Sequence, residues 1–214
     1  MDTAAWFARW AHLRYGGADP HAAAAWEALR TSAFAMSGED RWSEPHDGLS
    51  RTLLPKIDAA FRAKDAAAFA KLTETWLRLM DRLEAVTRTD RRFLLGPIVA
   101  HASRAAVGRA EREQLEYDLR SLYTVWGTRT ASEAGLHDYA NRELSGLIEG
   151  LYRPRWQRYF EELSSALAEN RAPRAMDWYA MEESWARTHE ELPTAPSGSP
   201  FEAAQAALDA LTQE

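Results

Sequence analysis

Large apolar residues recur three and four positions apart along most of this chain, which is the spacing of one face of an α-helix. Trp6, Trp10 and Leu13 show this spacing near the start. Clusters of turn residues interrupt the pattern and predict loops at residues 37–50 and 127–135. Residues 93–97 are predicted to form an apolar linker into a further helix, which ends near residue 108. The remaining predicted helices cover residues 2–15, 20–34, 51–63, 66–87, 111–126, 138–152, 154–169, 175–192 and 201–211.

Two helix starts carry clear local signals. Asp65 can cap the helix that runs to Thr87, and Pro154 suits the first turn of another helix. Valine and isoleucine are scarce, so the tendency to form strands is low. The predicted fold class is all-α: an irregular helical bundle of about nine to ten helices. We expect one domain over residues 1–214, with residues 193–200 as a linker before a short terminal helix.

Composition excludes several classes of function. The 214 residues include no cysteine and carry a formal net charge of −6. Disulfide scaffolds and thiolate metal sites are therefore excluded, and the negative charge argues against nucleic acid or an anionic membrane as a partner. The apolar runs are too short for a membrane span, and the first residues show no basic and apolar leader. We expect no membrane and no nucleic-acid partner, and no signal peptide in this stretch.

No sequence motif indicates a catalytic, metal or cofactor site. The six histidines lack the spacing of a zinc protease, and no phosphate-binding loop is present. Paired glutamates occur at residues 161–162, 182–183 and 190–191. Adjacent residues on a helix point about 100° apart, so we expect these pairs on solvated faces. The prediction is no catalytic residue, no metal and no cofactor in this chain.

Aromatic and hydrogen-bonding residues gather between Trp126 and Trp156. Tryptophan and tyrosine rings can stack on the apolar faces of sugars, and a concave site with a few polar groups is typical of a ligand pocket. The start of the predicted helix 138–152 would add unpaired N–H groups, with Asp138 as its cap. The alternative is that the rings fill the core of an alanine-rich bundle, which the nine tryptophans would also fit.

Four motifs occur in order in this region: Trp126-Gly127, His137-Asp-Tyr-Ala-Asn141, Leu144-Ser-Gly-Leu147 and Tyr152-Arg-Pro-Arg-Trp156. They resemble the C-terminal helical domain of the α-N-acetylglucosaminidase family (glycoside hydrolase family 89). The resemblance spans about residues 6–170 and departs from the family at the short segment 39–52. Further motifs that support it are Arg14-Tyr-Gly16, Ala25-Trp26, Ala60-Phe-Arg62 and Phe93-Leu-Leu-Gly-Pro97.

The resemblance implies a multidomain retaining glycosidase that releases terminal α-linked N-acetylglucosamine. Its two catalytic glutamates lie on a (β/α)₈ barrel, beside whose mouth the helical domain packs. The implied partners are an N-acetylglucosamine-terminated glycan and the barrel domain of the parent enzyme, and we expect this chain to be inactive alone. The implied location is secreted, periplasmic or lysosomal. The implied substrate-binding residues are Trp126, Leu136, His137, Tyr139 and Asn141.

A second function remains open to this sequence: a stand-alone helical interaction module that has kept the fold and lost the hydrolase. A reading frame upstream of Met1 that encodes a barrel with two glutamates would favour the enzyme. If the chain is an isolated domain, we expect its former docking surface to show as an exposed apolar patch near Trp126 and Tyr139.

Overall fold

The computed structural model describes residues 47–133 and 142–212, together with residues 5, 6, 9, 12, 13 and 20. In these residues the all-α prediction is confirmed, because they contain no strand and only one isolated bridge, between Leu94 and Ser145. The described part contains α3 (Asp47–Arg62), α4 (Ala66–Thr87), η1 (Arg91–Phe93), α5 (Leu95–Arg104), α6 (Arg109–Leu122), α7 (Arg129–Glu133), η2 (Ile148–Tyr152), α8 (Arg153–Ala168), α9 (Trp178–Ala186) and α10 (Pro200–Thr212).

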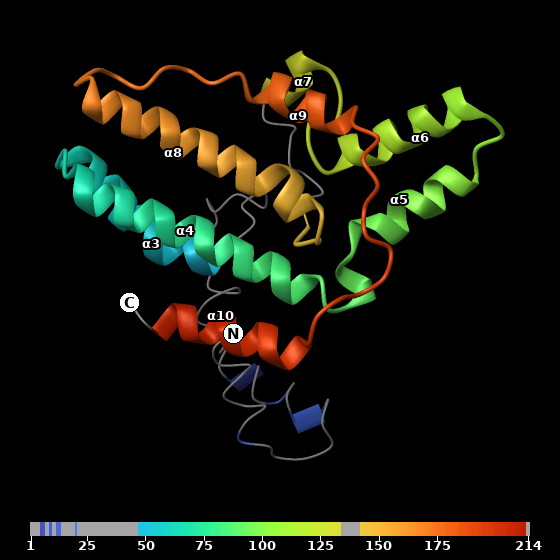
Figure 1. Ribbon diagram of the computed structural model, residues 1–214, viewed down its shortest axis with the longest axis horizontal. Helices are drawn as coiled ribbons and strands as arrows, with labels where there is room; N and C mark the ends of the chain where they lie inside the picture. Colours follow the sequence, from blue (N-terminus) through green and yellow to red (C-terminus); the bar gives the residue numbers. More distant parts are fainter. Residues whose placement is uncertain are drawn as a thin grey trace.

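The long helices α4 and α8 lie side by side and run in opposite directions, while α3 and α10 also pack against α4 (Figure 1). Helices α5 and α6 form a hairpin that projects to one side of this bundle. Helix α9 packs against α6 and α7, so it joins the hairpin to the start of α8. None of the described helices is long and apolar enough to cross a bilayer.

Aromatic rings fill the space between α4 and α8. Trp76 is fully buried, with its ring centroid 4.5 Å from that of Trp156 and 6.2 Å from that of Phe160. Phe69 meets the Phe160 ring edge-on at 6.4 Å. Truncation of such a buried ring to alanine costs about 3–5 kcal/mol. Tryptophan side chains therefore serve as core residues here, as expected from the alternative in which aromatic rings fill the core of the bundle.

The strongest local signals are confirmed at the helix ends. The Asp65 side chain accepts a hydrogen bond from the Ala68 amide at 2.9 Å and caps α4 as predicted. Lys64, just before it, has φ 55°, and the Asp65 amide donates to the Ala60 carbonyl at 3.0 Å. This is the usual hydrogen bond that closes a helix C-terminus. Pro154 lies in the first turn of α8, also as predicted.

Several predicted helix limits are wrong. Helix α3 begins at Asp47, inside the predicted loop 37–50, and continues through Pro55. Helix α6 ends at Leu122, so Trp126 lies beyond it, and the predicted loop 127–135 contains the short helix α7. Helix α9 covers only Trp178–Ala186 of the predicted 175–192. Near the start, residues 5, 6, 9, 12 and 13 are helical as predicted, although Trp6 and Leu13 are exposed.

The chain after α9 is extended because long-range contacts hold it. The buried guanidinium of Arg120 donates to the Thr188 hydroxyl at 3.1 Å and to the Glu190 carbonyl at 3.3 Å. The same segment presses on Gly96, where an added Cβ would lie 2.2 Å from the Pro193 carbonyl oxygen. These contacts account for the early end of α9 and for a glycine in the Phe93-Leu-Leu-Gly-Pro97 motif.

Candidate functional site

Trp126 lies in the loop that joins α6 to α7. The two preceding residues, Thr124 and Val125, are fully buried and fix the start of the loop. The Trp126 amide donates to the Ser121 carbonyl at 2.8 Å, and its own backbone then adopts φ 55°. Left-handed backbone costs a residue with a Cβ roughly 1–2 kcal/mol. The indole remains half-buried, so it does not belong to the closed core.

The strained loop is fastened on its other side to the beginning of α9. The Tyr179 hydroxyl donates to the Gly127 carbonyl at 3.3 Å. Arg129, in the first turn of α7, donates to both carboxylate oxygens of Asp177, at 2.8 Å and 3.1 Å. Its guanidinium also lies 4.7 Å from the centre of the Tyr179 ring. The hydrogen bond from Arg129 and then that from the Ala180 amide lower the pKa of Asp177, so this pair stays ionised at neutral pH.

Leu136, His137, Tyr139 and Asn141, with Asp138, lie outside the described residues. The described residues that flank this segment are Glu133, at the end of α7, and Arg142. Glu133, in α7, accepts a hydrogen bond from Arg129 at 3.1 Å. Burial raises the pKa of Tyr123, at the end of α6, while the positive charge of Arg142 acts in the opposite direction.

The predicted helix 138–152 is wrong over residues 142–146, which are not helical. This segment instead forms the bridge beside Leu94, where the Ser145 amide donates to the Phe93 carbonyl at 2.7 Å. The helix begins only at residue 147 and continues as η2. The described helix of this stretch therefore starts at residue 147, and Asp138, the predicted cap, lies outside the described residues.

A buried carboxylate holds the Leu144-Ser-Gly-Leu147 motif. Glu84 on α4 is 6% exposed and accepts a hydrogen bond from the Ser145 hydroxyl at 2.6 Å. It also accepts from the amides of Gly146, at 3.2 Å, and Glu149, at 3.3 Å. Gly146 has φ 91°, a backbone conformation that favours glycine. The motif is thus a fixed connection between the candidate site and the core.

The Tyr152-Arg-Pro-Arg-Trp156 motif also joins helices. Arg155 donates to Glu182 on α9 at 2.7 Å, and Glu182 is completely buried. The Arg155 guanidinium also lies 5.2 Å from the centre of the Tyr152 ring. Arg153 pairs with Asp81 on α4. These contacts attach the start of α8 to its two neighbouring helices.

The expectation that all paired glutamates lie on solvated faces is wrong at Glu182, because the Arg155 charge compensates its burial. It is also wrong at Glu162, which accepts hydrogen bonds from the Arg171 side chain and from a backbone amide. Glu190 and Glu191 are exposed, as expected. Within the described part of the chain, no group of acidic or histidine side chains is arranged to hold a metal ion.

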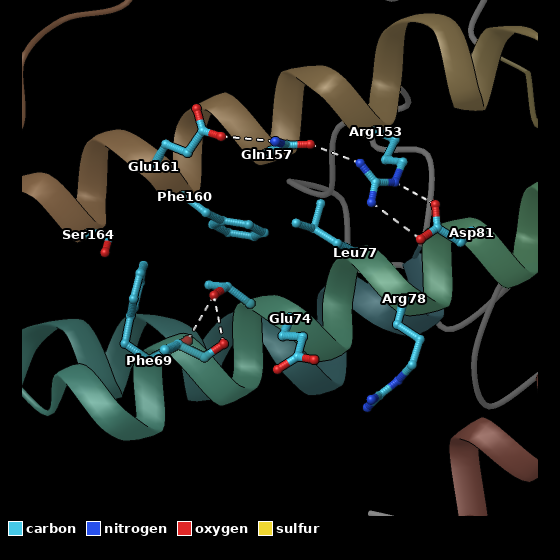
Figure 2. A pocket seen from close by; sticks show the side chains of 12 residues that line it. Phe69, Glu74, Leu77, Arg78, Asp81, Arg153, Gln157, Phe160, Glu161 and Ser164 are labelled. Atoms are coloured by element: carbon cyan, nitrogen blue, oxygen red, sulfur yellow. Dashed lines mark hydrogen bonds and ion pairs between the residues drawn. The ribbon is translucent and has the colours of Figure 1, made fainter.

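A groove of about 630 Å³ runs between α4 and α8 (Figure 2). Phe69 and Phe160 reach toward its interior, and Gln157 on the rim accepts from Arg153 and donates to Glu161. A second groove, of about 550 Å³, includes Glu116 and His189, whose side chains lie 2.9 Å apart. Neither groove is lined by Trp126, so the predicted site lies elsewhere, in the loop at the end of α6.

The fold belongs to a known class of helical domain. A family 89 glycoside hydrolase from Clostridium perfringens, in complex with PUGNAc, superposes with a TM-score of 0.71 and 26% identity over 77% of this chain and 19% of that chain. A form from the same organism with two glutamate-to-glutamine substitutions, in complex with its substrate GlcNAc-α-1,4-galactose, gives 0.78 over 98% of this chain and 31% of that chain. At 19% identity the second likeness shows the fold alone.

The family model for the alpha-N-acetylglucosaminidase (NAGLU) C-terminal domain matches residues 6–52 and 47–210, so the chain belongs to this family. The two matched parts meet in the stretch where the sequence departs from the family pattern. The chain is 27% identical over 223 residues to alpha-N-acetylglucosaminidase of Homo sapiens. That alignment covers 78% of this chain and 30% of the human protein, so the chain spans less than a third of this relative's length.

Proposed function

We propose that this chain completes the glycan pocket of an α-N-acetylglucosaminidase, with Trp126 as part of the pocket wall. The observation that carries this proposal is the backbone of Trp126: a bulky residue stands at φ 55°, and its indole is left half-buried in a loop fastened on both sides. Strain of this kind is characteristic of functional sites, where the side chain must point in one direction.

The relatives support a glycan as the ligand. The Clostridium perfringens structures hold PUGNAc in one case and GlcNAc-α-1,4-galactose in the other. In the proposed complex the two catalytic carboxyl groups, about 5–5.5 Å apart for a retaining mechanism, lie on the barrel domain. Trp126, Leu136 and Tyr139 would exclude water and hold the terminal sugar, with His137 and Asn141 available for its hydroxyl groups.

The test is hydrolysis of an aryl α-N-acetylglucosaminide. The chain alone is expected to give no turnover above background. In an enzyme that contains both a barrel and this domain, Trp126→Ala should lower kcat/KM at least about tenfold. This corresponds to a loss of about 1.4 kcal/mol in stabilisation of the transition state. Leu115→Ala is the matched control, because Leu115 is also half-buried but lies within α6.

The control should change kcat/KM less than about twofold, since Leu115 lies within α6 and is not among the residues proposed for the pocket. Equal losses in the two variants would assign Trp126 to the core and reject the pocket. An upstream frame without a barrel, combined with specific binding to another protein, would instead favour the interaction module.

A further inference from the structure

Three residues from two distant parts of the sequence hold the Trp126 loop. Arg129 lies on α7, while Asp177 and Tyr179 lie at the start of α9. Asp177 is the N-cap of α9 and accepts from the Ala180 amide at 2.9 Å, so its carboxylate is already fixed when Arg129 binds it. We call Arg129, Asp177 and Tyr179 the loop clamp.

The loop clamp acts on the backbone next to Trp126. Gly127, the following residue, accepts the Tyr179 hydroxyl at 3.3 Å, and Arg129 is only two residues further along. On the other side the loop is held by the Trp126 amide bond to Ser121 at 2.8 Å. A loop fixed at both ends can keep its central residue in a conformation that an isolated chain would avoid.

We infer that Arg129 is a positioning residue for the sugar pocket: through Asp177 and Tyr179 it holds the Trp126 loop in the conformation that binds the glycan. This inference rests on the proposed function but extends it to residues on α7 and α9. It predicts that sugar affinity depends on a surface cluster that does not itself touch the sugar.

The opposite end of α9 provides a matched control. There Arg187 pairs with Glu183 at 2.5 Å, and its guanidinium lies 4.4 Å from the centre of the Tyr117 ring. The Tyr117 hydroxyl donates to Glu183 at 3.0 Å. This cluster combines the same kinds of group as the loop clamp, but it joins α9 to the middle of α6. A general stabilising role would therefore be shared by Arg129 and Arg187.

The first measurement is amide hydrogen exchange in the chain itself. Arg129→Gln should speed exchange at the Trp126 and Ser132 amides by about fivefold, the scale of losing an exposed but bidentate pair. Arg187→Gln should change the exchange rates of these two amides less than about twofold. Both variants should lower the unfolding temperature of the chain by a similar amount. Arg129→Lys keeps the charge without the planar pair of donors, so it should fall between wild type and Arg129→Gln.

The second measurement is glycosidase kinetics in an enzyme that contains a barrel and this domain. Arg129→Gln should raise KM about fivefold with a smaller change in kcat, because a displaced wall weakens binding of the ground state and the transition state alike. Arg187→Gln should leave both constants unchanged.

The outcomes separate the inference from the proposed function. Unchanged loop exchange in Arg129→Gln overturns the inference. An unchanged KM in Arg129→Gln, in an enzyme where Trp126→Ala lowers kcat/KM, also overturns it and leaves the proposed function intact. If Trp126→Ala has no effect on kinetics, the proposed function fails, and the positioning role fails with it.

Discussion

Glu84 is the residue whose replacement should most disturb the segment that follows the candidate site. Within the described residues its carboxylate accepts hydrogen bonds from four groups: the Ser145 hydroxyl at 2.6 Å, the Gly146 amide at 3.2 Å, the Glu149 amide at 3.3 Å and the Arg88 guanidinium at 3.0 Å. The side chain is only 8% exposed, so water can replace few of these bonds.

The size of the effect follows from this arrangement. A hydrogen bond to a charged group contributes about 1.5–3 kcal/mol, and donors left without an acceptor in the interior cost a similar amount. Only the bonds from the Ser145 hydroxyl, at 2.6 Å, and the Arg88 guanidinium, at 3.0 Å, are short, so we count these two and neglect the longer amide bonds. Glu84→Ala should then destabilise the chain by about 3–5 kcal/mol, comparable with the loss of one partner from a buried ion pair.

Glu84→Gln is the more discriminating variant because it preserves the shape. Its amide group must turn two N–H donors toward a site that already consists of donors, so we expect a loss of about 2–3 kcal/mol. Glu74→Gln is the control, since Glu74 lies exposed on the same helix and should change stability by less than about 0.5 kcal/mol.

The assay is urea unfolding followed by circular dichroism, together with exchange of the Gly146 amide. The account expects faster exchange at Gly146 in Glu84→Gln but not in Glu74→Gln. If the two variants unfold at the same urea concentration, the Glu84 bonds contribute nothing net, and the explanation of the 142–147 segment is wrong.

Three further predictions concern stability. Trp126→Gly should be more stable than Trp126→Ala by about 1 kcal/mol in urea unfolding, because glycine tolerates φ 55°. At Leu115, inside α6, the order should reverse by about 0.5–1 kcal/mol, and the same order at both sites would show that Trp126 is not strained. Gly96→Ala should lower stability by about 1–3 kcal/mol, because the new Cβ would lie 2.2 Å from a backbone oxygen, and an unchanged thermal transition would reject that close contact. The hydrogen bond from Arg171 lowers the pKa of Glu162 from 4.5 to about 2, so its stabilising effect is complete above pH 4.5 and is lost as the pH falls toward 2. The stability difference between wild type and Glu162→Gln should therefore shrink over that pH range, and a difference that stays constant would contradict this.

Helices with both a continuous apolar face and a local cap could be predicted from sequence. Helix α4 is the clearest case, because Asp65 caps it and its apolar positions face the core for its whole length. The first turn of α8 was also predicted, since Pro154 fits that position, although η2 runs directly into α8. In these places local preference and tertiary packing agree.

The remaining limits depend on contacts with distant parts of the chain. Residues 142–146 resemble a helix locally, but Phe93 and Glu84 bind their backbone and side chains instead. Helix α9 ends early because Arg120 and Gly96 hold the chain that follows it. Such contacts override local propensity and have no signature within a short stretch of sequence.

For the candidate site, the motif at Trp126 could be identified from its resemblance to the family, but its strained backbone could not. The loop clamp was missed altogether. Arg129 and Asp177 are 48 positions apart, and each is an ordinary charged residue in its own surroundings. Nothing in the local pattern at either position indicates that they meet.

The most direct test of the account is a structure of an enzyme that contains both a barrel and this domain, with N-acetylglucosamine bound. The account predicts that the Trp126 indole lies within about 4 Å of the sugar, which is ordinary contact distance. An indole that lies more than about 8 Å from the sugar, beyond the reach of any direct contact, would contradict it.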